Sequence, residues 1–289
     1  MGIPDFYLPQ YETLIYSLSR GTCIFFGAGL SQLAGYKSWV DLRKSMITYF
    51  WERRSEIPYD RRKLFDYSSC EDLLNHENDI EAFTYLDYLS NALFVKGIKD
   101  IFYTDEQDSN NKIFSFLNRL NNGNNFYVTT NIDRGFQKHI SLPDEHVSIN
   151  PEFKNPPKII NYLHGRVDRE DTWVFTRDKY NIGYIVDESP CMKFLQSIFE
   201  NYNVLFIGYG LREGDINRVI SSTSRKKHHF WLEPSSRSKE GPLKIRSTCM
   251  RENYNVHLIP YFIDEEGYDL LLKTIEALST VVSAKLRGI

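Results

Sequence analysis

TCIFFGAGLS, residues 22–31, carries the clearest structural signal in this chain. Its first five residues are apolar or β-branched and predict a strand, and the two glycines that follow predict a tight turn into a helix. Such a strand–turn–helix unit is how a parallel α/β sheet begins. Just before it, residues 9–20 carry Leu14, Ile15 and Leu18 at helical spacing, which predicts a helix packed on that sheet.

Five more apolar runs predict the rest of the sheet: residues 125–130, 159–163, 203–208, 229–232 and 256–261. Helical patterns lie between or after several of them, at 192–202, 215–221 and 268–285. Continuous apolar strands that alternate with helices favour an α/β fold with a mostly parallel sheet covered on both faces.

The segment from about 38 to 120 has a different pattern. Its apolar residues recur at threes and fours, as in Trp39, Leu42 and Met46, with few strand-like runs. We therefore predict one domain over 1–289, in which a helical insertion at about 38–120 follows the first βα unit and separates two parts of the core, 9–37 and 121–289.

Composition excludes several classes of protein. The 289 residues carry 35 Lys and Arg against 38 Asp and Glu, so no global charge points to nucleic acid or an anionic membrane. Cysteines occur only at 23, 70, 191 and 249, without a CxxC pair, so neither a cysteine zinc site nor a disulfide framework is expected. Without a secretory signal or an apolar stretch of roughly 18 residues, a cytoplasmic protein is expected.

In an open parallel sheet, ligands bind beyond the carboxyl ends of the strands, so the residues after each strand are the candidates for a functional site. The first such end holds Gly27, Ala28, Gly29 and Ser31. Glycines there let a backbone approach a diphosphate, and the serine adds a hydroxyl. Gln32 takes the place of the third glycine of a dinucleotide fingerprint, so a simple tight turn is an equal alternative.

Two other strand ends carry groups suited to catalysis. After 125–130, Asn131 and Asp133 lie two residues apart, as catalytic groups or as helix caps. After 159–163, His164 precedes Gly165. A lone histidine is more often structural, but a neutral imidazole suits proton transfer near pH 7.

The end of the 203–208 run has glycines again. Gly208 and Tyr209 there suit the second half of a dinucleotide, and Asp215 either caps the next helix or binds a ribose hydroxyl.

Together and in this order, these segments resemble the sirtuin-like family. Its motifs GAGxS, TxNID, HG and Gx[SG]L correspond to GAGLS at 27–31, TTNID at 129–133, LHG at 163–165 and GYGL at 208–211. The resemblance covers roughly residues 20–35 and 123–265, and the TTNID and LHG segments in register are its specific part.

The resemblance implies a Rossmann-like fold that holds NAD. It implies that Asn131 and Asp133 hold the nicotinamide end and its ribose, and that His164 is the catalytic base. The full set of residues it implies for NAD binding is Gly27, Ala28, Gly29, Ser31, Thr130, Gly208, Tyr209 and Asp215.

The chain departs from sirtuin deacylases in two places. Deacylases have a zinc module with two CxxC pairs soon after HG, whereas here the stretch from Arg166 to Asp171 has no cysteine. They also follow GAGxS with GIPDFR, whereas residues 35–39 read GYKSW without the arginine. Both absences resemble the sirtuin-like NAD hydrolases of bacterial anti-phage systems, and no metal is expected. An NAD-dependent protein deacylase and a non-catalytic NAD or ADP-ribose sensor or scaffold subunit are the alternatives.

An NAD hydrolase that is always active would kill its host. We therefore expect control by assembly into a homo-oligomer or by a partner protein. By family resemblance, the partner is a HerA-type ATPase or an Argonaute-like or other phage-sensing subunit.

Overall fold

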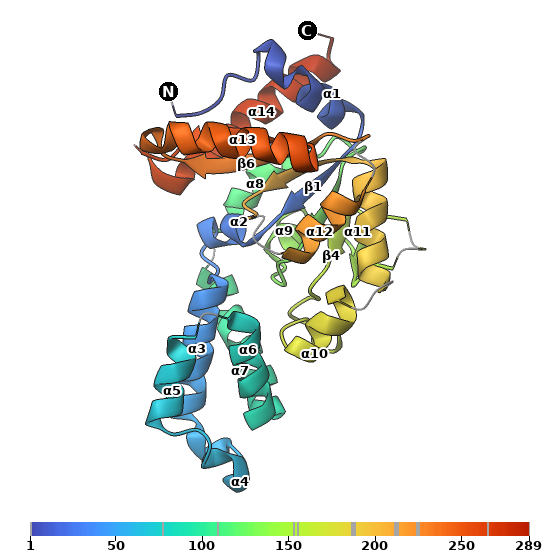
Figure 1. The fold of residues 1–289 in the computed structure, drawn as a ribbon. Helices are drawn as coiled ribbons and strands as arrows, with labels where there is room; N and C mark the ends of the chain where they lie inside the picture. The colour runs from blue at the N-terminus through green and yellow to red at the C-terminus, as the bar shows by residue number, and fades with distance from the viewer. Residues whose placement is uncertain are drawn as a thin grey trace.

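The computed structural model describes residues 2–76, 78–108, 110–152, 154, 156–185, 189–210, 214–223, 226–264 and 266–288. Its centre is a seven-stranded sheet in the order β3-β4-β2-β1-β5-β6-β7, with every neighbouring pair parallel (Figure 1). The predicted α/β class with a parallel sheet is confirmed. The strands are β1 (Thr22–Phe26), β2 (Phe126–Thr129), β3 (Val147–Ile149), β4 (Ile160–Tyr162), β5 (Asn203–Ile207), β6 (His229–Ser235) and β7 (Val256–Phe262).

The strand β1 lies at the middle of the sheet. All five of its residues are buried, and it pairs with β2 on one side and with β5 on the other. The chain crosses to the β2 side first and returns to the β5 side later, so strand order reverses beside β1. In open α/β sheets, the crevice at such a reversal is where ligands bind.

Helices cover both faces of the sheet. On one face, α1 (Glu12–Arg20) and α14 (Leu270–Leu286) pack together over Ile24 and Phe26. On the other, α11 (Pro190–Asn201) and α12 (Gly214–Ser222) lie over Cys23 and Phe25. Because side chains of a strand alternate between its faces, one apolar strand fills both halves of the core.

The sequence did not predict the strand β3 or the helix α13 (Glu240–Tyr254), nor the short helices α9 (Gly135–His139) and α10 (Arg177–Tyr180). The edge strand β3 has only three residues, all half-buried. The helix α13 packs along β7 and has no fully buried residue. Neither segment has a continuous apolar run or a clear helical stripe, which are the signals that the other elements supply.

Between α2 (Ala28–Leu33) and β2, the described residues form helices and turns and no strand. These helices are α3 (Trp39–Glu52), α4 (Tyr59–Arg62), α5 (Tyr67–Leu74), α6 (Asp79–Leu89), α7 (Asn91–Asp108) and α8 (Phe114–Asn118). The first five project away from the sheet, whereas α8 lies beside it (Figure 1) and contacts α14. The division of the chain at 38 and 120 stays a prediction.

Ion pairs join the long helix α7 to the rest of the chain. Lys37 Nζ, in the turn after α2, lies 2.6 Å from Asp105 Oδ1. Lys138 Nζ on α9 (Gly135–His139) lies 2.5 Å from Glu106 Oε1. These contacts hold the helical segment over the carboxyl ends of β1 and β2.

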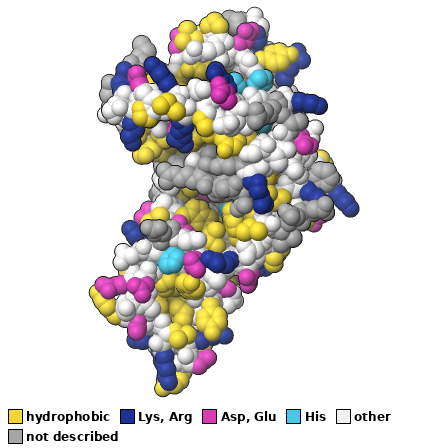
Figure 2. Space-filling view, viewed as in Figure 1, with side chains coloured by type: hydrophobic (Ala, Val, Ile, Leu, Met, Phe, Trp, Pro, Cys, Tyr) yellow, Lys and Arg dark blue, Asp and Glu magenta, His cyan; other side chains and the backbone are white. Residues whose placement is uncertain are grey.

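Charged side chains of both signs are interspersed on the face shown in Figure 2. No described helix is both long enough and apolar enough to cross a membrane.

Candidate active site

Two glycine turns touch each other at the crevice beside β1. Gly29 N–H donates to the carbonyl oxygen of Gly208 at 2.8 Å. A Cβ on Gly29 would lie 2.9 Å from that oxygen, and one on Gly208 would lie 2.6 Å from Leu30 N. Gly208 also has a φ of +59°. The glycines are thus needed for close contact between the ends of β1 and β5, and the Gly29 N–H already has a protein partner.

Ser31, Asn131 and Asp133 form one buried hydrogen-bonded group. Asn131 Nδ2 donates to Ser31 Oγ at 2.7 Å, and Ser31 Oγ donates to Asp133 Oδ2 at 2.8 Å. Asp133 Oδ1 accepts the Gly135 N–H at 3.0 Å, at the start of α9. One carboxylate oxygen therefore accepts the first backbone N–H of α9 from the position before the N-cap Arg134, while the other accepts from the serine.

Burial dominates the electrostatics of Asp133. It raises the pKa of this carboxyl to about 6, although the Ser31 hydroxyl and the Gly135 amide partly offset the rise by bonding to the charged form. Thr130, next to Asn131, is buried as well.

His164 lies two residues beyond β4, with only 4% of its surface exposed. Aromatic rings surround it, with the Tyr184 centroid at 5.4 Å and the Trp39 centroid at 6.2 Å. Neither imidazole nitrogen has a hydrogen-bond partner among the described residues. Burial lowers the pKa of His164 to about 4, so the imidazole is neutral near pH 7.

Gly165 fixes the turn after this histidine. Its φ is +85°, and a Cβ there would lie 2.3 Å from the Thr172 carbonyl oxygen. Only glycine fits at position 165, so the backbone conformation alone explains the glycine of the HG dipeptide, without any role in catalysis.

Trp39 separates the two groups of candidate residues. With Asn131 and Asp133 it lines a cavity of about 30 Å³, close to the share of one water molecule in the liquid. With His164 and Tyr180 it also lines a cavity of about 350 Å³. The structure thus brings Ser31, Asn131 and Asp133 into contact and places His164 beyond the indole, so the smaller cavity must widen before it can hold a nicotinamide ring.

A third cavity, of about 480 Å³, lies on the other side of β1. Its lining includes three residues that the sequence predicts for NAD binding: Gly29, Gly208 and Tyr209. Residues at the end of β6 and the start of α13 also line it. Tyr209 packs on Phe25, with ring centroids 4.9 Å apart. The side chain of Asp215 lies outside the part of the chain that the structure describes, as does Leu211 of the GYGL segment.

Sequence reasoning missed two charged residues of this cavity, Glu233 and Arg246. They form an ion pair across it. Glu233 is the only charge in the apolar run of β6, and this break in the pattern is a signal that would have found it. Arg246 lies on the unpredicted helix α13, so the sequence gave no reason to place it there.

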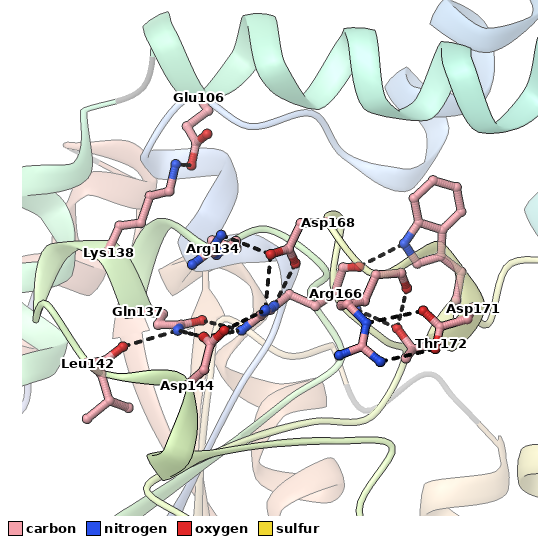
Figure 3. A network of polar contacts seen from close by, with 12 residues as sticks. Glu106, Arg134, Gln137, Lys138, Leu142, Asp144, Arg166, Asp168, Asp171 and Thr172 are labelled. Atoms are coloured by element: carbon pink, nitrogen blue, oxygen red, sulfur yellow. Dashed lines mark hydrogen bonds and ion pairs between the residues drawn. The ribbon is translucent and has the colours of Figure 1, made fainter.

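A buried arginine organises the chain just after the HG dipeptide (Figure 3). Arg166 Nη1 lies 2.7 Å from Asp144 Oδ1, and Arg166 Nε lies 2.6 Å from Asp168 Oδ1. This pairing lowers the pKa of Asp144 to about 2. Asp168 also binds Arg134, the residue after Asp133, at 2.9 Å. The network ties the loop after β4 to the loop after β2, in the stretch where deacylases carry their zinc module.

The described residues contain no group of three or more His, Cys, Asp or Glu placed to hold a metal ion.

The raised pKa of Asp133 predicts how the stability of an Asp133→Asn variant compares with wild type as pH changes. Between about pH 4, the ordinary range of an aspartate, and about pH 6, the folded state keeps a proton that the unfolded chain has lost. The contribution of Asp133 to the free energy of unfolding therefore falls as pH rises through this window, by about 3 kcal/mol in all.

The measurement is urea unfolding of both proteins at about pH 4 and about pH 7. The variant should gain about 2 kcal/mol on wild type between the two pH values, since part of the window lies below pH 4. His164 has a lowered pKa, so its contribution to the free energy of unfolding changes with pH in the direction opposite to that of Asp133. Because His164 is present in both proteins, its contribution cancels when the two are compared. A difference that does not change with pH would show that the pKa of Asp133 is not raised.

Comparison with known proteins agrees with this architecture. Residues 125–259 match the family model of the SIR2-like domain, a range that holds Asn131, Asp133 and His164 but not the first glycine turn. The chain is 26% identical over 207 residues to the NAD(+) hydrolase ThsA of Enterococcus faecium, which covers 68% of this chain and 39% of that protein.

A second relative is the NAD(+) hydrolase ThsA of Acinetobacter baumannii (strain 532279), 24% identical over 216 residues, with 72% of this chain and 39% of that protein covered. The chain thus spans about two fifths of the length of the curated relatives it matches. The chain is thus similar to the SIR2-like family in its parallel sheet, in the residues at its strand ends and in these matches.

Proposed function

We propose that this protein is an NAD+ hydrolase that cleaves the bond between nicotinamide and ribose, and releases nicotinamide and ADP-ribose or cyclic ADP-ribose. The observation that carries the proposal is His164, a buried neutral imidazole with no hydrogen-bond partner among the described residues, at the end of a strand next to β2. The names of both relatives support it.

The proposed reaction does not require the protein to protonate the leaving group. Nicotinamide in NAD+ is a cationic pyridinium, so it departs without protonation, and the protein must stabilise the oxocarbenium-like ribose and place a nucleophile. We assign His164 as the base that takes a proton from water or from a ribose hydroxyl.

Asn131 and Asp133 would act as a unit with Ser31. The serine hydroxyl accepts from Asn131 and donates to Asp133, so each side chain is held in a fixed orientation. In the proposed reaction, Asn131 positions the nicotinamide amide or the attacking water, and Asp133 fixes the ribose beside it. Such preorganised polar groups lower barriers because they need no reorientation when charge develops.

Cavity volumes are consistent with a dinucleotide. The cavities beside His164 and beside Glu233 measure about 350 and 480 Å³, within the range of about 300–1,000 Å³ typical of ligand sites. They lie on opposite sides of β1, so NAD would run across the crevice between them. The nicotinamide half would lie toward β2 and β4, over Ala28, Ser31 and Thr130, and the adenosine half toward β5 and β6, over Gly208 and Tyr209.

The test is product analysis after the purified protein is incubated with NAD and without any peptide. We keep the protein in excess over NAD, so that a weakly active enzyme is detected. Nicotinamide should appear together with ADP-ribose or its cyclic form in equal amounts. Turnover that starts only when an acyl-peptide is added would indicate a deacylase, and ADP-ribose binding without any turnover would indicate a non-catalytic sensor.

We also propose that the activity depletes NAD in anti-phage defence and is controlled by assembly or by a phage-sensing partner such as a HerA-type ATPase. Support for this role comes from the sirtuin-like resemblance alone. Mass measurement in solution beside the activity assay checks the control, and a fully active monomer would contradict it.

A further inference from the structure

The guanidinium of Arg166 uses all of its N–H groups in hydrogen bonds (Figure 3). Nε and Nη2 donate to the two oxygens of the Asp168 carboxylate, at 2.6 and 3.0 Å. Nη1 donates to Asp144 at 2.7 Å and to Gln137 at 3.2 Å, and Nη2 also donates to Asp144 at 3.3 Å. Because the donors of a guanidinium lie in one rigid plane, these bonds fix the three acceptor side chains relative to one another.

Two of the three acceptors belong to the chain that follows β2. Gln137 lies on α9, the helix whose first backbone N–H donates to Asp133 at 3.0 Å, and Asp144 follows that helix. Arg166 itself comes from the loop after β4, two residues beyond His164. Its guanidinium therefore joins the segment that carries one candidate catalytic residue to the segment that carries another.

Two further bonds join the same loops closer to the candidate site. Asp168, held by Arg166, accepts from Arg134 Nη1 at 2.9 Å. The backbone N–H of Val167 donates to the carbonyl oxygen of Ile132 at 2.9 Å. Ile132 is the residue between the amide and the carboxylate of the TTNID segment. The loop after β4 is thus bonded to the loop after β2 on both sides of its candidate polar groups.

The arrangement supplies geometry more than stability. The Asp144 and Asp168 side chains are 65% and 36% exposed, although that of Arg166 is only 4% exposed. An ion pair that reaches solvent in this way is worth at most about 1 kcal/mol. Placement has a larger effect on reaction rate, because a shift of about 1 Å at a reacting group can cost about 100-fold.

We propose that Arg166 is a positioning residue, which docks the loop after β4 onto the loop after β2. The docking sets where His164 lies relative to Asn131 and Asp133. The proposal rests on the proposed function, since it takes these three residues to be the ones that act on NAD. Arg166 itself does not touch the substrate, and it acts only through the two loops.

Arg166→Lys tests the proposal in the activity assay. Lysine keeps the positive charge, but its donors lie on a single nitrogen and cannot bind both carboxylates and the amide together. The kcat for nicotinamide release should fall by about 100-fold, while the KM for NAD should change by less than about threefold. Arg166→Lys combined with Asp168→Asn should lose little more than Arg166→Lys alone, because both substitutions break the same link.

A second measurement needs no turnover. Hydrogen exchange is followed by mass spectrometry in peptides that cover residues 129–138 and 163–169. In Arg166→Lys the exchange should become faster by about tenfold in both peptides, because the bond from Val167 to Ile132 and the first N–H of α9 lose the contacts that hold them. A melting curve shows that the variant is folded.

Arg62→Lys is the matched control. Arg62 also holds a turn through its guanidinium, which donates to the carbonyl oxygens of Ser55 and Ile57, but it lies in the helical segment. This variant should keep the wild-type kcat and leave the exchange of both peptides unchanged. A loss of kcat equal to that of Arg166→Lys would show a general effect on the fold, and would contradict the positioning role.

The two readouts separate this proposal from the proposed function. Wild-type protein that releases no nicotinamide would contradict the hydrolase, and the exchange of the two peptides would still decide whether Arg166 docks the loops. An active wild type with an equally active Arg166→Lys variant would leave the hydrolase standing and refute the positioning role. Faster exchange in only one of the two peptides would also refute it, because the loops would then move independently.

Discussion

Replacing His164 with alanine is expected to lower the rate of nicotinamide release by about 10²–10⁴, the range typical of a lost general base. The physical reason is its state in the folded protein. The imidazole is neutral near pH 7, and both its nitrogens are free of protein partners among the described residues, so one of them can accept the proton. The measurement is nicotinamide release by chromatography under single-turnover conditions.

The chain supplies a matched control in His229. This histidine is also buried, its Nδ1 has no partner among the described residues, and burial lowers its pKa to about 3. It differs in position, because it is the first residue of β6. It therefore lies at the amino ends of the strands, away from the candidate site at their carboxyl ends, and packs against Phe199. His229→Ala should keep the wild-type rate. Equal losses in the two variants would mean that a buried imidazole matters for stability and not for chemistry.

The largest effect on stability is expected at Gly208. A Cβ at this position would lie 2.6 Å from Leu30 N, a backbone atom that cannot move without shifting α2. Its φ of +59° adds strain for any other residue. We expect Gly208→Ala to lower the free energy of unfolding by about 3 kcal/mol or more, at the upper end of what single substitutions do.

Gly267 separates the two causes. Its φ of +65° is nearly the same, but a Cβ there meets nothing within 4 Å. Gly267→Ala should therefore cost only the backbone strain, about 1–2 kcal/mol. Both free energies come from urea unfolding curves. Equal costs at the two glycines would show that the two turns can move apart, contrary to the close contact of Gly29 and Gly208.

The sequence predicted the interior strands because they are buried on both faces. In β1, β2 and β5 nearly every residue is apolar, so the pattern is independent of what packs on either side. The strand β3 and the helix α13 are stabilised at the edge, by contacts to β4 and β7 that the local sequence does not encode. Propensity and pattern are weak wherever burial is partial.

The candidate site shows the same division. Asn131, Asp133 and His164 could be predicted because each follows a strand, and strand ends meet at one edge of a parallel sheet. The hydrogen bond from Ser31 to Asp133 spans 102 positions, and the contact of Trp39 with His164 joins the helical segment to the end of β4. Such contacts depend on how whole elements pack, which the spacing of residues within one segment does not report.

The central position of β1 has a consequence for synthesis on the ribosome. Its residue Thr22 pairs with Asn203, which is translated 181 positions later. At about 5–20 residues per second, this apolar strand waits about 10–40 s for its second neighbour. The preceding helix α1 can shield one face meanwhile, but α14, which packs against that helix, is made only after all seven strands. The nascent chain is thus most prone to aggregate through the strand that ends up best protected.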